Sequence, residues 1–135
     1  MTVNTKIYEV YMKNLDDLKK IDGIIEKIKR EHEKLENLKK EVIKEGKYTE
    51  WEKMNTDLEN SISIDKEKLK GLLESLNEIL ETIPNVENKF EFQKGSQKYV
   101  FSKTRNCFNV EQLQIFSDEE NPTKRSFDLD IYRAL

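Results

Sequence analysis

The feature that most constrains this chain is a short turn between two long stretches of helical periodicity. Gly46 can adopt the left-handed conformation that commonly ends a helix. Thr49 and Glu52 have the spacing of a capping box, in which each side chain bonds a free backbone N–H at a helix start. Helices joined by so short a connection must fold back on each other. The sequence therefore predicts a long antiparallel helical hairpin.

The first predicted helix runs from about Leu15 to Glu45. Its interface positions recur at steps of three and four, which is the period of a coiled coil. These positions are Leu18, Ile21, Ile25, Ile28, His32, Leu35, Leu38 and Val42. The pattern thus places His32, a half-polar ring, in the interface between the helices.

The second predicted helix runs from about Glu50 to Ile83 and ends before Pro84, which cannot continue it. Its interface positions are Trp51, Asn55, Leu58, Ile62, Asp65, Leu69, Leu72, Leu76, Ile79 and Ile83. Antiparallel pairing places Ile28 near Asp65. Polar residues at such positions usually cost stability and fix the register or the number of partners.

Residues 5–12 are rich in β-branched and aromatic side chains, which favours a strand. Asn14, followed by Leu15 and two aspartates, resembles a helix N-cap with an acidic first turn. We therefore predict that residues 1–13 form the N-terminal strand of a small sheet, with a helical start as the alternative.

After Pro84 the hydrophobic period changes from about 3.6 to 2. Residues 90–92 and 99–101 flank a predicted hairpin loop at 94–97, residues 109–116 form a further strand, and 127–131 form the last one. The expected fold is α+β, with a coiled-coil-like helical hairpin at 14–84 joined to an antiparallel sheet region at 85–135. The chain is expected to form a single domain with a helical arm.

Charge and composition restrict the classes of partner. The net charge is -3 and no segment is polybasic, which argues against double-stranded DNA as a partner. No apolar run approaches the roughly 20 residues that span a bilayer, and the N-terminus lacks a signal-peptide pattern. A single cysteine fits a cytoplasmic protein. The 20 lysines against 4 arginines, with one alanine, suggest an AT-rich genome such as that of a phage or another mobile element.

The residues that usually carry catalysis are scarce. His32 and Cys107 are the only histidine and cysteine, which is too few for a structural zinc site. No glycine-rich phosphate-binding loop occurs. We therefore expect no catalytic residues, no metal and no cofactor, and a protein that is not an enzyme.

One segment suggests ligand binding. Residues 89–105 hold five basic residues and one acid, interleaved with aromatic residues, and three of the four arginines lie in the last 31 residues. Aromatic and basic side chains on a sheet can hold nucleotides or single strands, although half-exposed sheets show the same alternation. The candidate ligand contacts are Lys98, Lys103, Arg105, Phe108 and Arg125.

Two functions follow from these patterns. The first is a non-enzymatic, self-associating binding protein, a homodimer or higher oligomer, that acts as a scaffold or inhibitor of a protein partner. Tyr48 and Trp51, at the tip of the hairpin, would be its partner-binding aromatics. The alternative is that the sheet binds and sequesters a nucleotide, another anionic ligand or a single-stranded nucleic acid.

Overall fold

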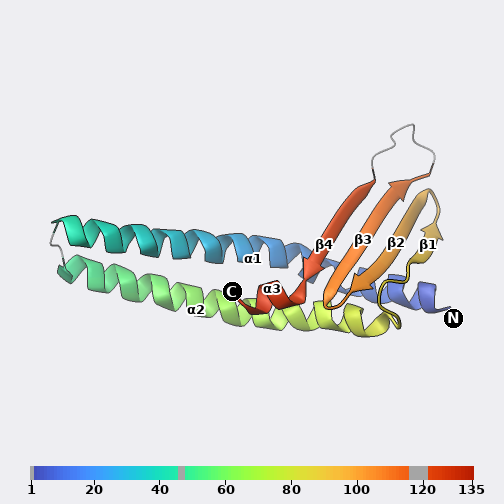
Figure 1. Cartoon of the computed structure of the whole chain (residues 1–135), viewed down its shortest axis with the longest axis horizontal. Helices are drawn as coiled ribbons and strands as arrows, with labels where there is room; N and C mark the ends of the chain where they lie inside the picture. The colour runs from blue at the N-terminus through green and yellow to red at the C-terminus, as the bar shows by residue number, and fades with distance from the viewer. Residues whose placement is uncertain (1, 46–47, 116–121) are drawn as a thin grey trace. The chain divides into compact units, whose positions relative to one another are not determined.

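The computed structural model describes residues 2–45, 48–115 and 122–135 (Figure 1). For residues 42–45 and 48–50 it describes the backbone only. Two long helices pack against each other and precede a four-stranded antiparallel sheet and a short helix. This confirms the predicted α+β fold. The elements are α1 (Val3–Glu45), α2 (Tyr48–Thr82), β1 (Phe90–Lys94), β2 (Gln97–Thr104), β3 (Cys107–Gln114), β4 (Thr123–Asp128) and α3 (Leu129–Arg133).

The chain divides into two compact units, and each long helix contributes to both. The sheet unit comprises Met1–Leu18 with Leu73–Leu135, and the arm unit comprises Lys19–Leu72. The predicted turn at 46–47 lies outside the described residues. Since α2 begins at Tyr48, Thr49 falls inside its first turn and not at the predicted cap position.

The prediction of an N-terminal strand is wrong, because residues 5–12 belong to α1. Ile7, Tyr11, Asn14 and Leu18 recur at steps of four and three, and all four are buried on one side of the helix. Burial of this face against α2 and the sheet outweighs the modest strand preference of β-branched and aromatic residues.

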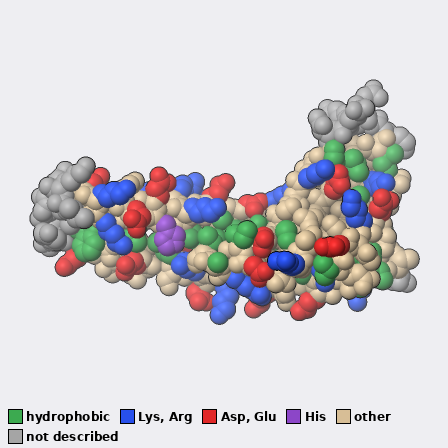
Figure 2. Space-filling view, in the orientation of Figure 1, with side chains coloured by type: hydrophobic (Ala, Val, Ile, Leu, Met, Phe, Trp, Pro, Cys, Tyr) green, Lys and Arg blue, Asp and Glu red, His purple; other side chains and the backbone are tan. Residues whose placement is uncertain are grey.

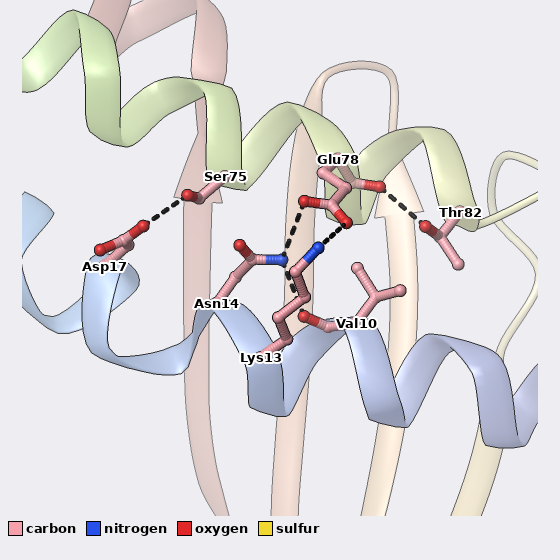
Figure 3. A network of polar contacts seen from close by, with 7 residues as sticks. All are labelled: Val10, Lys13, Asn14, Asp17, Ser75, Glu78 and Thr82. Carbon is pink, nitrogen blue, oxygen red and sulfur yellow. Dashed lines mark hydrogen bonds and ion pairs between the residues drawn. The ribbon is translucent and has the colours of Figure 1, made fainter.

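Asn14, predicted to cap a helix, instead lies within α1 and joins it to α2 (Figure 3). Its Nδ2 donates to the Val10 carbonyl at 2.9 Å and lies 3.4 Å from Glu78 Oε2. Lys13 forms an ion pair with the same glutamate at 3.0 Å, and the Ser75 hydroxyl donates to Asp17 at 2.6 Å. These contacts fix the antiparallel register of the helices in the sheet unit.

In the arm unit the interface includes Glu31 and not the predicted His32. Glu31 is 6% exposed, whereas His32 lies on the surface. The buried positions on α1 are Ile28, Glu31 and Leu35, so the interface uses residue 31 where the predicted heptad uses residue 32. On α2 the predicted Asp65 is buried, and Lys27 contacts it at 3.2 Å. The antiparallel pairing near Asp65 therefore agrees with the sequence pattern.

The sheet has the strand order β1-β2-β3-β4, so each strand pairs with its neighbour in sequence. Lys94 pairs with Gln97, which makes the first turn tighter than the predicted loop, and Gly95 permits this with a φ of 60°. The next turn brings Thr104 opposite Cys107, with Arg105 at a φ of 56°. A non-glycine residue in this left-handed region carries a conformational cost.

The predicted last strand at 127–131 is only partly correct. β4 ends at Asp128, and its side chain accepts hydrogen bonds from the backbone N–H groups of Asp130 at 3.0 Å and Ile131 at 3.2 Å. This is the geometry of a helix N-cap, and α3 begins at Leu129. Local capping therefore prevails over a strand-like alternation of apolar residues.

One face of the sheet carries the core of the sheet unit. Strand pairing places the aromatic residues of all four strands on this face. Those of β1, β2 and β3 contact the N-terminal part of α1. Tyr8 stacks on Phe92 with ring centroids 4.3 Å apart, and Tyr11 packs 5.2 Å from Phe101. The fully buried aromatic rings are Phe101, Phe108 and Phe127. The sheet's aromatic residues therefore supply stability.

None of the described helices is long and apolar enough to cross a membrane.

Candidate binding site

The five predicted ligand contacts do not share one surface. By strand register, Lys103, Phe108 and Arg125 lie on the face that packs against α1, whereas Lys98 lies on the opposite face. Arg105 is exposed in the turn between β2 and β3. The alternation of basic and aromatic residues in the sequence therefore separates into a buried aromatic face and a polar outer face.

Most of these side chains already have structural contacts. Phe108 is 0% exposed. Lys103 Nζ donates to the Leu80 carbonyl at 3.0 Å, which satisfies an acceptor near the C-terminal end of α2. Lys98 pairs with Glu91 at 3.3 Å, and the Arg125 guanidinium lies 4.8 Å from the centroid of the Phe127 ring. A shared anion-binding role for the five residues therefore has no geometric support.

The two predicted partner-binding aromatics lie at the start of α2. The side chain of Tyr48 is outside the described residues. Trp51 is half-buried, and its indole N–H is buried with no hydrogen-bond partner among the described residues. The side-chain oxygen of Asn55, one helical turn later, is also buried and unpaired. Trp51 is therefore neither fully exposed nor fully satisfied in the single chain.

A groove of about 460 Å³ lies between α1 and α2 close to these residues. Its apolar part is formed by half-buried Leu38 and Leu58 and by Met54, which is 51% exposed. Charged and amide side chains form its rim. The lining residues are Lys34, Asn37, Leu38, Glu41, Met54, Asp57 and Leu58. The groove is therefore an apolar strip bordered by polar groups, as is usual for a protein-binding surface.

The sequence analysis missed this groove, although part of its signal was present. Leu38 and Leu58 were predicted as interface residues, and they are only half-buried. Met54 lies one turn before Leu58 on α2, outside the predicted interface. In Figure 2, hydrophobic side chains lie along the line between the two helices, with charged side chains on either side. Two helices alone leave part of this apolar strip uncovered.

A buried pair of carboxyl groups lies further along the arm. Glu31 is 6% and Asp65 2% exposed, yet both oxygens of Glu31 and Oδ2 of Asp65 have no hydrogen-bond partner among the described residues. The neighbouring Glu31 carboxyl, and then a hydrogen bond from Lys27, lowers the pKa of Asp65, while burial opposes this shift. Glu31 therefore influences the pKa of Asp65, while its own carboxyl oxygens stay poorly satisfied. The pair is a costly polar interruption of the interface.

The described residues offer little for nucleophilic or metal chemistry. Burial is the main cause that raises the pKa of the Cys107 thiol, and Asp128 adds to it, so the reactive thiolate is disfavoured. His32 belongs to the arm unit and Cys107 to the sheet unit. Within 2–45, 48–115 and 122–135, no group of three or more His, Cys, Asp or Glu side chains could hold a metal ion.

Comparison with known protein families, curated proteins and solved structures found no match.

Proposed function

We propose that this chain is a non-enzymatic, self-associating binding protein that acts as a scaffold or inhibitor, and that it binds another polypeptide through its helical arm. The observation that carries this proposal is the groove lined by Leu38, Met54 and Leu58. A binding function fits a surface that combines exposed apolar area with a polar rim.

The shape of the groove favours a polypeptide over a small molecule. Small-molecule sites usually enclose most of the ligand, whereas this groove lies open along two parallel ridges of helical side chains. A helix laid along such a groove can bury Met54 and the exposed edges of Leu38 and Leu58. Trp51 is half-buried and lies three residues before Met54 on α2. Tryptophan is a type of residue that dominates the energy of many interfaces.

The alternative, capture of an anionic ligand by the sheet, receives less support. Of its five candidate contacts, Phe108 is buried in the core and Lys103 is engaged with the α2 carbonyl of Leu80. Lys98 lies on the other face of the sheet and pairs with Glu91. A nucleotide would have to break existing contacts to engage the set.

A photo-crosslinking experiment tests the proposed function. A benzoylphenylalanine placed at Met54 reports on the groove, and the same group at the exposed Glu33 is the control. Glu33 lies about 140° around α1 from Leu38 at 100° per residue. We expect covalent adducts to a polypeptide from position 54 only, and their loss when Leu58→Asp is added.

Equal adduct formation from both positions, or none from position 54 in purified protein and in an extract of the native cells, would overturn the proposal. Far-UV circular dichroism of the Leu58→Asp variant shows whether its helices remain folded. If they do not, the milder Met54→Ser change serves in its place, because Met54 is half-exposed and contributes little to the folded core.

A further inference from the structure

We infer that the polypeptide in the groove is a second copy of this chain, with the two α1 helices antiparallel across a two-fold axis near Leu38. This inference rests on the proposed function and names its partner. The argument starts from the rim of the groove, where Lys34 and Glu41 flank Leu38 on α1. Both charged side chains are exposed, and neither forms an ion pair with any described residue.

The spacing of these two charges is self-complementary. Lys34 and Glu41 are seven residues apart, so they lie on the same side of α1, separated by about 10 Å along its axis. Leu38 lies between them and is turned toward α2. A two-fold axis at this level places Lys34 of each copy opposite Glu41 of the other, and two ion pairs enclose the apolar centre. A two-fold contact must match a surface to itself in this way.

The α2 side of the groove agrees with the same axis. The Lys27–Asp65 contact sets the antiparallel register of the arm, and by that register Met54 lies level with Leu38. The axis therefore brings the Met54 side chains of the two copies together. Leu58 and Trp51, which lie four residues after and three before Met54, then face each other across the interface. The exposed methionine and the half-buried tryptophan would be covered by this contact.

The resulting contact forms a four-helix bundle from two helical hairpins, a common way to cover the open side of such a pair. A parallel arrangement is the geometric competitor, because it would place Lys34 near Asp57 of the second copy. That arrangement leaves Glu41 without a partner, and the antiparallel one leaves Asp57 without one; the antiparallel arrangement is chosen because it pairs the two charged residues that flank Leu38 on the same helix. We therefore commit to the antiparallel arrangement.

Sedimentation equilibrium on a charge-swap series tests this inference. We expect the wild-type chain to dimerise, and Lys34→Glu to raise the dissociation constant about tenfold, because two attractive contacts become repulsive. The double variant Lys34→Glu/Glu41→Lys restores the pairs in the antiparallel arrangement and should return to within about threefold of wild type. Lys29→Glu, with the same charge change about 140° around α1 from Lys34, is the matched control and should leave dimerisation unchanged.

Three results would overturn the inference. The first is a wild-type chain that stays monomeric at the highest soluble concentration. The second is a dimer that Lys34→Glu does not weaken. The third is a Lys34→Glu dimer that Glu41→Lys fails to rescue, which would indicate the parallel pairing with Asp57. All three charge changes are at exposed positions, so the fold should persist, and circular dichroism verifies this.

The outcome separates this inference from the proposed function. A monomeric chain that still forms adducts from position 54 with a different protein would refute the second copy and the self-association, and leave in place the binding of another polypeptide through the arm. A chain that dimerises with no adduct from position 54 would refute both, because its interface would lie elsewhere.

Discussion

Replacing Glu31 by leucine is expected to stabilise the helical arm by about 2 kcal/mol. Glu31 is buried in the interface between α1 and α2, and neither of its carboxyl oxygens has a well-formed hydrogen bond. Leucine has a similar length and a similar helix propensity, so the change tests mainly the polar group. A glutamate at such a position lowers the stability of the interface and can in return specify the register or the association of the helices.

The magnitude follows from opposing terms. Relief of a buried, unsatisfied polar group is worth about 1–3 kcal/mol, and burial of a leucine side chain adds about 1.5–3 kcal/mol. The loss of the interaction with Asp65 removes at most about 1.5–3 kcal/mol, which is the value of a well-formed hydrogen bond to a charged group. A net gain of about 2 kcal/mol agrees with the general result of replacing buried ionic groups by apolar ones.

Urea unfolding followed by far-UV circular dichroism measures this gain. With a denaturant slope of about 1–3 kcal/mol/M, the midpoint of the arm's transition should rise by roughly 1 M. Glu33→Leu, at an exposed position two residues away, is the control and should change stability by less than about 0.5 kcal/mol. A clear loss of stability in Glu31→Leu would refute the reasoning, because it would show that the carboxyl is well satisfied in solution.

Three further predictions follow from other contacts. Folding lowers the pKa of Asp65 below its ordinary value of 3.8, so its contribution to stability is present above that value and is lost as the pH falls through the folded pKa. Acid titration of the unfolding free energy should show this loss, and Asp65→Asn should flatten it; an unchanged profile would contradict the assignment. Arg105→Gly should raise stability by about 1 kcal/mol because glycine relieves the left-handed φ of 56°; a lower melting temperature would instead reveal a stabilising contact of the arginine. Phe101→Ala should destabilise the sheet unit by about 3–5 kcal/mol in thermal unfolding, against a small effect of Ser102→Ala, and similar effects of the two changes would argue against the aromatic core.

Part of the candidate site could be anticipated from sequence. Leu38 and Leu58 were identified as interface residues, and Trp51 as a residue near the hairpin tip. That they border an open groove depends on how closely α1 and α2 approach there, which no single-chain periodicity specifies. The predicted anion contacts are separated for a related reason: alternation places Lys98 and Phe108 on faces of the sheet, but only strand register shows that the faces are opposite.

Local sequence preferences also led to wrong predictions for the N-terminal segment and for one position of the interface between α1 and α2. Residues 5–12 have strand-like composition, yet they extend α1 because Ile7 and Tyr11 are buried on one helical face. His32 fits an ideal heptad, yet Glu31 occupies the interface. Which of two adjacent residues is buried depends on a small rotation of one packed helix against the other, and the heptad pattern of the sequence does not specify that rotation.

The sequence by itself determined the hairpin of two long helices and the change to strands after Pro84, because hydrophobic periods of 3.6 and 2 are local properties of the chain. Only the tertiary structure decided which face each residue occupies. In the tertiary structure Phe108 and Glu31 are buried, Lys103 bonds a carbonyl of α2, and Met54 is exposed in the same groove as Leu38. The physical reason is that burial depends on the approach of segments distant in sequence, and that approach is set by packing between elements and not by the pattern within one.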